Sequence, residues 1–335
     1  MATSAKAFSP KEFKVLIISD ATNAGTSGIH DGNMHQLDVD SVGFPSLNVT
    51  QALDVRSGAG HTLKDEDFFQ DNTLRVVELS LSGTMHNDTG HNLLMHNITG
   101  ETSGNGVVSA GHTIVSQKYG AAVTDAASSL TVIIQPSDVT NQRGLEFAGC
   151  VVTNFSLSAD VGTEGGRYKF SATLQTGVKP DLNSTAAADN NSPYSNTTDC
   201  SLVTGSGFKV MNSDVVLNSF TSTIDYPAVF SGLNTTSAGA GYETVSRGAE
   251  CAVTVDCQVK YDAETKTLVS GYDTQTAHNA TNSFVITNNN AFGVAIDNAV
   301  YTNVAYSEGD VMMLDISMKS VDDGTDPLIT IDVTS

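Results

Sequence analysis

The sequence is poor in positive charge. Its 335 residues include 16 Lys and Arg against 37 Asp and Glu, which gives a formal net charge of −21. Proteins that hold a phosphate backbone without sequence preference use clustered Lys and Arg to displace counterions. The composition therefore argues against a nucleic-acid-binding protein of that kind.

Large aromatic residues and long apolar runs are also scarce. The chain has no Trp and only 9 Tyr, which argues against a carbohydrate-stacking surface. No run approaches the roughly 20 apolar residues of a membrane span. The apolar stretch around Val15 to Ser19 is too short for the core of a signal peptide. We therefore expect no membrane span, and synthesis and folding in the cytoplasm.

Cysteine is too rare for a disulfide framework. The four cysteines are Cys150, Cys200, Cys251 and Cys257. The last two stand six residues apart in an alternating strand, about 20 Å along it, which is beyond bridging distance. We expect all four thiols to be free.

Charged residues of both signs make up only 16% of the chain, against about a quarter in ordinary globular proteins. Ser, Thr, Asn and Gly take their place, and surfaces of such residues lose less side-chain entropy in a contact than Lys, Glu or Arg do. Two interpretations stay open at this point: a self-associating protein, or an ordinary β-rich one. The length suggests roughly two domains, and 39% hydrophobic residues suffice for a core.

An internal repeat is the most informative feature of the sequence. Residues Leu79 to Asp88 form an alternating strand that runs into a polar turn, and a short apolar run follows. Residues Val253 to Asp262 have the same layout. A shift of 174 residues aligns the following pairs: Leu79 with Val253, Leu81 with Val255, Met85 with Val259, Asp88 with Asp262, and Leu94 with Leu268. We expect Asp88 and Asp262 to open short helices, as turn or N-cap residues.

Each half continues with a buried-type strand and a hairpin. In the first half the strand is Leu130 to Ile134, and the hairpin joins Leu145 to Leu157 with Arg167 to Gln175. In the second half the corresponding segments are 283–287, 292–306 and 310–319. The predicted fold is mainly β, with two tandem β-sandwich or barrel domains that each carry one short α-helix.

The predicted domain bounds follow from this repeat. We assign 41–178 to a first β domain and 205–335 to a second. Residues 179–204 are rich in turn formers without periodicity and are predicted to be a linker or long loop. Residues 1–40 form an N-terminal extension to which we assign no role.

No residues stand out as catalytic, cofactor-binding or metal-binding. His86, His91 and His96 are spaced by five, which does not place them on one helical face, so we expect polar surface roles. Asp65, Glu66 and Asp67 fit a solvated turn. Asp322, Asp323 and Asp326 lack the spacing of a calcium loop. We expect no enzymatic activity, no cofactor and no metal.

The closing strands of the two halves lack the residues that usually protect a sheet edge. Tyr168 to Gln175 carries Lys169 alone, and Val311 to Met318 carries no Lys or Arg. If these strands are edges, they are prepared for pairing with another chain. A chain with two similar units can also fill two successive positions of a ring.

The layout of strands, short helix and closing hairpin resembles the tail tube proteins of long-tailed bacteriophages. The segments that carry the resemblance are GGRYKFSATLQTG (165–177) and EGDVMMLDISMKS (308–320), within about 40–178 and 205–335. The resemblance implies a β-sandwich or barrel with one flanking helix, and rings whose sheets join into an inner barrel. It is strongest for the fused, two-domain version, which forms trimeric, pseudo-hexameric rings. The N-terminal residues 1 to 40 are a departure from the family.

The resemblance further implies a structural virion protein, made in the bacterial host cytoplasm. Its partners would be copies of itself in stacked rings, other tail proteins at the tube ends, and the tape measure protein inside the lumen. DNA would later pass through the same acidic lumen without tight binding.

Three alternatives stay open. A tail-terminal ring, baseplate hub or distal tail protein would share the domain without stacking into a tube. An adhesin-like surface β-sandwich is favoured by Asn-x-Ser/Thr triplets such as those at Asn48, Asn87 and Asn97, but lacks an evident export signal. A β-fold hydrolase with paired carboxylates is the third, with no pair to nominate.

Overall fold

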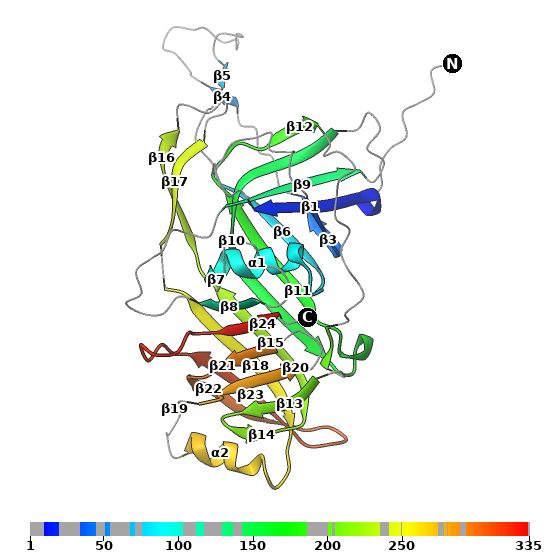
Figure 1. Cartoon of the computed structure of the whole chain (residues 1–335), viewed down its shortest axis with the longest axis vertical. Helices are drawn as coiled ribbons and strands as arrows, with labels where there is room; N and C mark the ends of the chain where they lie inside the picture. Colours follow the sequence, from blue (N-terminus) through cyan, green and yellow to red (C-terminus); the bar gives the residue numbers. More distant parts are fainter. Residues whose placement is uncertain are drawn as a thin grey trace, which may run out of the picture.

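The protein is mainly β, as the sequence predicts (Figure 1). The computed structural model describes a set of segments that together cover most of the chain. They are residues 10–19, 34–44, 51–53, 68–70, 76–102, 112–116, 129–136, 143–185, 200–202, 205–234, 241–248, 250–273, 278–279, 281–288 and 293–333. The predicted acidic turn at Asp65, Glu66 and Asp67 lies outside these residues.

Eight strands of the largest sheet lie side by side and are called the central sheet here. All neighbouring pairs in it are antiparallel. In spatial order its strands are β3 (Val39–Gly43), β6 (Val77–Thr84), β11 (Lys169–Thr176), β10 (Arg143–Asp160), β15 (Leu217–Asp225), β18 (Ala252–Lys260), β23 (Met313–Ser320) and β22 (Ala299–Ser307). The first four come from the first half of the chain and the last four from the second half.

Further strands form an outer layer in each half. In the first half, β10 extends beyond the central sheet and pairs there with outer strands. It pairs with β9 (Leu130–Pro136) and β12 (Asp181–Thr185); β1 (Phe13–Ser19) then pairs with β9, and β2 (His35–Leu37) pairs with β1. A seven-stranded sheet combines five strands of the second half with β8 and β7 of the first, in the order β14 (Ser213–Asp214), β13 (Gly205–Val210), β20 (Phe284–Asn288), β21 (Gly293–Ile296), β24 (Thr330–Val333), β8 (His112–Ser116) and β7 (Gly100–Thr102).

The remaining elements are helices, short strands and two separate hairpins. They are η1 (Pro10–Glu12), α1 (Thr89–Thr99), η3 (Glu164–Gly166), α2 (Lys266–Asp273), β19 (His278–Asn279), and the hairpins β4 (Gln51–Leu53) with β5 (Phe68–Gln70) and β16 (Ala228–Asn234) with β17 (Gly241–Arg247). In Figure 1 the hairpin β16–β17 runs along the upper left flank of the molecule, and α2 lies at the bottom of the view.

The two halves repeat the same strand pairing. In the first, β6 lies between β3 and β11, and β11 pairs with β10. In the second, β18 lies between β15 and β23, and β23 pairs with β22. Leu81 and Val255, which the 174-residue shift aligns, take equivalent places: Leu81 lies opposite Ala172 of β11, and Val255 lies opposite Met318 of β23.

The outer elements correspond in the same way. β1 pairs with β2 and β9, while β13 pairs with β14 and β20. β12 pairs with the start of β10, and β24 pairs with β21, which leads into β22. A hairpin follows the third strand of each half, β4–β5 in one and β16–β17 in the other. We call β1 to β12 the first unit and β13 to β24 the second unit.

Both helices begin at the predicted aspartates. The backbone N–H of His91 donates to Oδ1 of Asp88 at 2.9 Å, which caps α1. The backbone N–H of Thr265 donates to Oδ1 of Asp262 at 3.1 Å in the turn that opens α2. The same strand, capped turn and short helix therefore occur twice.

The predicted N-terminal extension and the predicted linker each contain a strand that pairs with other strands of the first unit. β1, inside the predicted extension 1–40, pairs with β9 along its whole length, and Val15, Leu16 and Ile17 are fully buried. β12, inside the predicted linker 179–204, pairs with β10. Both segments contribute strands to the first unit. The buried run in β1 is apolar on both faces, so it lacks the alternation of a strand with one exposed face.

The prediction about sheet edges is wrong in its choice of strands. β11, predicted as an edge, lies between β10 and β6, and β23 lies between β18 and β22. The ends of the central sheet are instead β3 and β22. Which strand is an edge depends on pairing between distant segments, which the local composition of a strand does not encode.

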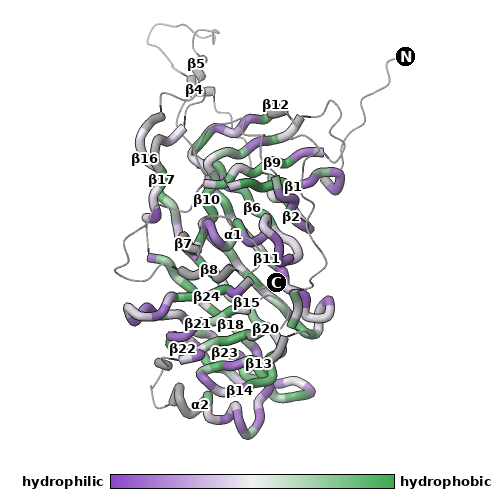
Figure 2. The backbone as a smooth tube through the Cα atoms, in the orientation of Figure 1, coloured by the Kyte–Doolittle hydropathy of each residue, from purple (hydrophilic) through white to green (hydrophobic). Residues whose placement is uncertain are grey.

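Alternation places the core on one face of the central sheet. In β18, Val253, Val255, Cys257 and Val259 are buried while the residues between them are not. Hydrophobic segments run along many of the strands, and hydrophilic ones fill many of the turns (Figure 2). The helix α1 packs on this buried side against β1, β2 and β10.

Candidate functional site

The face of the central sheet that points away from the core is polar. We define the polar face as the unburied, alternate residues of its six inner strands. They are Glu78, Ser80, Ser82 and Thr84; Lys169, Ser171, Thr173 and Gln175; Asn154, Ser156, Ser158 and Asp160; Ser219, Thr221, Thr223 and Asp225; Thr254, Asp256, Gln258 and Lys260; and Met313, Asp315, Ser317 and Lys319. Almost all are small or polar.

Carboxylates outnumber ammonium groups on the polar face. The acidic members are Glu78, Asp160, Asp225, Asp256 and Asp315, and the basic members are Lys169, Lys260 and Lys319. Neighbouring strands are also linked by amide donors: Nε2 of Gln175 donates to Oε2 of Glu78 at 3.1 Å, and Nε2 of Gln258 donates to Oδ1 of Asp315 at 2.8 Å. Such cross-strand pairs add to the stability of the sheet.

In the central sheet the two units meet at an antiparallel pair of strands, β10 and β15, called the joint here. Its register runs from Asn154 opposite Asp225 to Asp160 opposite Ser219. On the polar face, Oγ1 of Thr223 donates to Oγ of Ser156 at 3.3 Å across the joint. The sheet therefore passes from one unit to the next without a break.

On the core side of the joint, the opposed side chains of the two strands are buried. Leu157 lies opposite Ser222, and each is only 3% exposed. Phe155 lies opposite Ile224, and both are buried. The joint thus has a continuous backbone ladder, a polar side and an apolar side.

The counterparts of the two joint strands in the other unit, β3 and β22, lie at the two ends of the central sheet. Within the described residues, β3 pairs only with β6, and β22 pairs with β23 and, at Ala299 and Val300, with β19. β3 corresponds to β15, and β22 corresponds to β10. Val42 and Val304 are half-buried, although the matching joint residues are buried.

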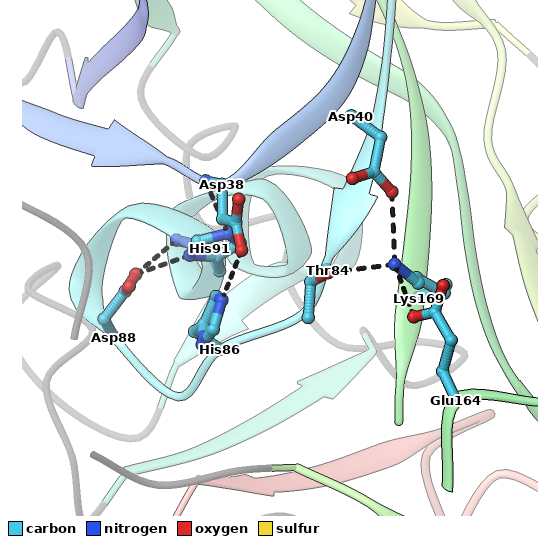
Figure 3. A network of polar contacts seen from close by, with 8 residues as sticks. All are labelled: Asp38, Asp40, Thr84, His86, Asp88, His91, Glu164 and Lys169. Carbon is cyan, nitrogen blue, oxygen red and sulfur yellow. Dashed lines mark hydrogen bonds and ion pairs between the residues drawn. The ribbon is translucent and has the colours of Figure 1, made fainter. Parts of the chain in front are cut away.

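The edge strand β3 is held to the rest of the first unit by a lysine on the polar face (Figure 3). Nζ of Lys169 lies 3.1 Å from Oδ2 of Asp40 and 3.0 Å from Oε2 of Glu164, and it donates to Oγ1 of Thr84 at 3.0 Å. Partial burial opposes the charge of Lys169, but the two carboxylates outweigh it and raise its pKa. Lys169 thus stays charged and fixes Asp40 of β3 over β11.

Two histidines lie behind the same edge, between the β2–β3 link and α1 (Figure 3). Nε2 of His86 lies 2.8 Å from Oδ2 of Asp38, and Nδ1 of His91 lies 2.8 Å from Oδ1 of Asp88. Burial acts to raise the pKa of Asp88, but its hydrogen bonds with the side chain and backbone of His91 prevail, and the net shift is downward. The carboxylate of Asp88 therefore stays ionised.

The predicted surface roles of the three histidines are wrong. His91 is fully buried, and His86 and His96 are 4% and 8% exposed. The aspartate that contacts His86 lies 48 residues away in the sequence. Spacing along a helix cannot reveal a partner at that separation.

Other chemistry-bearing residues have plain structural settings. All four cysteines are free, as predicted. Asp322 and Asp323 accept backbone N–H groups of Gly324 and Thr325 in an exposed turn. In the described part of the chain, no group of three or more His, Cys, Asp or Glu is arranged to hold a metal ion, and no helix is long and apolar enough to cross a membrane.

The hairpin β16–β17 is anchored by one partly buried arginine. The guanidinium of Arg247 donates to the carbonyl oxygens of Val152, Tyr226 and Asn97 at 2.8, 2.7 and 2.9 Å. It also lies over the Tyr226 ring, 4.8 Å from the centroid. Burial lowers the pKa of Arg247 from its usual value. A single side chain thus connects the hairpin with β10 and the end of α1.

Comparison with protein-family models and with curated proteins finds no match for this chain.

Proposed function

We propose that the protein is a structural virion protein that builds the tail tube of a bacteriophage. Three chains form a pseudo-hexameric ring, and stacked rings form the channel through which the genome passes into the host. The observation that carries the proposal is the joint. It pairs the two units through the same two strand positions that are left open at β22 and β3.

The open strands have the geometry needed to repeat the joint between chains. Val304 lies opposite Ile316 in β23, as Leu157 lies opposite Phe170 in β11. Val42 lies opposite Leu81 in β6, as Ser222 lies opposite Val255 in β18. By this correspondence, Val304 of one chain pairs with Val42 of the next.

An interface between two different edges generates a ring when its rotation closes. Each chain supplies eight strands of the central sheet, so three chains would supply 24. Barrels of about 16 to 18 strands already leave an aqueous channel. A closed barrel of this size has room for a large linear cargo.

The polar face suits the lining of such a channel. Its carboxylates repel phosphates, and its few ammonium groups are partly neutralised, as Lys169 is by Asp40 and Glu164. DNA in contact with such a surface gains no counterion release and so is not retained. The apolar face is occupied by the core, which leaves the polar face for the lumen.

Electron microscopy of the purified protein and of native particles tests the proposal. We expect tubes of stacked rings with three-fold symmetry. Isolated rings that do not stack would instead indicate a tail-terminal ring, baseplate hub or distal tail protein. A stable monomer at high concentration, with neither rings nor tubes, would contradict the proposal.

A further inference from the structure

Two buried histidines and two partly buried aspartates form a polar cluster, called the histidine latch here, next to the edge strand β3. They are Asp38, His86, Asp88 and His91 (Figure 3). Asp38 lies in the link between β2 and β3, and Asp88 and His91 lie at the start of α1. The latch therefore connects the edge of the central sheet with a helix in the core.

The contacts of His91 require a neutral imidazole. Its Nε2 accepts the backbone N–H of Asp38 at 3.3 Å, so this nitrogen carries no hydrogen. Its Nδ1 donates to Oδ1 of Asp88 at 2.8 Å. A proton added at Nε2 would point at the Asp38 N–H, and both groups would be donors without an acceptor. Because His91 is fully buried, water does not replace the lost contact.

The other charged and titratable groups around His91 are few. On the β2–β3 side are Asp38 and His35, and on the β6–α1 link is His86, whose ring centroid is 5.3 Å from that of His91. From β11, the Phe170 ring meets His91 edge-on and adds no charge. Burial lowers the pKa of His35 despite the nearby charge of Asp88, and burial also lowers the pKa of His96.

Protonation would therefore act on a compact site. Two imidazolium rings at the separation of His86 and His91 repel each other, and the Asp38 backbone loses its acceptor at the same time. β3 has five residues and pairs only with β6 within the described chain; the ion pair of Asp40 with Lys169 and the packing of Val39 and Val42 on the core also hold it.

We propose that protonation of His91 in acid releases the Asp38 backbone and loosens β3, which makes the edge of the central sheet acid-sensitive. The inference concerns regulation of the proposed assembly edge and rests on the proposed function for its consequence, the opening of rings at low pH.

Hydrogen exchange of the Asp38 amide tests the release directly, with each rate divided by the rate of an unstructured peptide at the same pH. Between about pH 7.5 and pH 5, we expect the protection of this amide to fall at least about tenfold. In His91→Gln, whose amide can accept from Asp38 and donate to Asp88 at every pH, we expect less than about a twofold change. His96→Gln, also on α1 but outside the latch, is the matched control and should behave as the parent chain.

Unchanged protection of Asp38 in the parent chain, or an equal fall in His91→Gln, would overturn the inference. If His91→Gln does not fold, an NMR titration of the parent chain decides: the His91 ring must titrate together with the loss of Asp38 protection, and separate transitions would refute the latch. Tube dissociation near pH 5 is followed in parallel. Absence of tubes at neutral pH contradicts the proposed function alone, because the exchange measurement does not require assembly.

Discussion

Leu157 of β10 lies opposite Ser222 of β15, and both side chains are buried where the two units of the chain join. The residues at the corresponding positions of the open strands, Val304 and Val42, are only half-buried. This pair of strand edges is therefore joined once within the chain, between β10 and β15, and its counterparts β22 and β3 lie at the two ends of the central sheet. The account of this protein as a ring-forming subunit depends on that difference.

Paired cysteines test the register between chains. In Val42→Cys/Val304→Cys, we expect a disulfide that links successive chains when the assembled protein is oxidised, because directly opposed residues have Cβ atoms about 4.5 to 5.5 Å apart. Non-reducing electrophoresis would show closed trimers and their partly linked forms. The control Val42→Cys/Ser307→Cys places the second thiol three residues out of register and should give little product. Equal cross-linking of both pairs would argue against the register.

Gly83 of β6 tests whether β3 is needed for assembly. A Cβ on Gly83 would lie 2.7 Å from Cα of Val39 and would also collide with the carbonyl oxygen of Asp38. We expect Gly83→Ala to displace β3 and to destabilise the chain by about 1 to 3 kcal/mol. Tube formation should be lost while most of the β-sheet circular dichroism remains.

Gly309→Ala is the matched control for this change, because its added Cβ would meet only the carbonyl oxygen of Val311 at 3.7 Å, an ordinary contact. Normal tubes formed by Gly83→Ala would mean that β3 is dispensable for assembly.

Arg247 should carry much of the attachment of the hairpin β16–β17. Arg247→Met removes the donors to three carbonyl oxygens and leaves them in a largely buried setting. We expect a loss of about 2 to 4 kcal/mol in guanidinium unfolding of the unassembled chain. Lys209→Met removes a cation that is 37% exposed and 3.8 Å from its exposed partner Asp214. This control should cost less than about 0.5 kcal/mol. Similar losses in both variants would contradict the proposed anchor.

Charge reversal on the polar face tests its placement in the lumen. In particles that carry Asp256→Lys/Asp315→Lys, we expect DNA ejection in vitro to slow several-fold at low salt and to recover as salt screens the new contacts. Asp322→Lys/Asp326→Lys makes the same change of charge in an exposed turn outside the central sheet. That control should change the rate by less than about twofold. An effect of equal size from the turn would place the polar face elsewhere than in the channel.

Local patterns in the sequence predict the repeated parts of the fold. The strand before Asp88 and the strand before Asp262 alternate cleanly, and both aspartates cap the turns that follow. The hairpin of β10 and β11 likewise follows from alternation on either side of a glycine-rich turn, in which Gly165 and Gly166 have positive φ. These features depend on neighbouring residues only, and so the sequence contains them directly.

The parts that sequence reasoning missed depend on distant partners. β1 is apolar on both faces, so its Val15 to Ile17 run shows no alternation, and β12 has only five residues. The open edges follow from the order of strands, which joins β10 to β15 and leaves β3 and β22 at the ends. The histidine latch needs Asp38 from another strand connection. A signal for it in the sequence is the concentration of five histidines from His35 to His96, although the sequence does not reveal their partners.

A three-dimensional reconstruction of the assembled protein by cryo-electron microscopy, at a resolution that separates strands, tests the central claim most directly. We expect three chains per ring and one uninterrupted inner barrel, with β22 of each chain hydrogen-bonded to β3 of the next and Val304 opposite Val42. An assembly in which β3 and β22 face solvent, or in which chains meet through other elements, would contradict it.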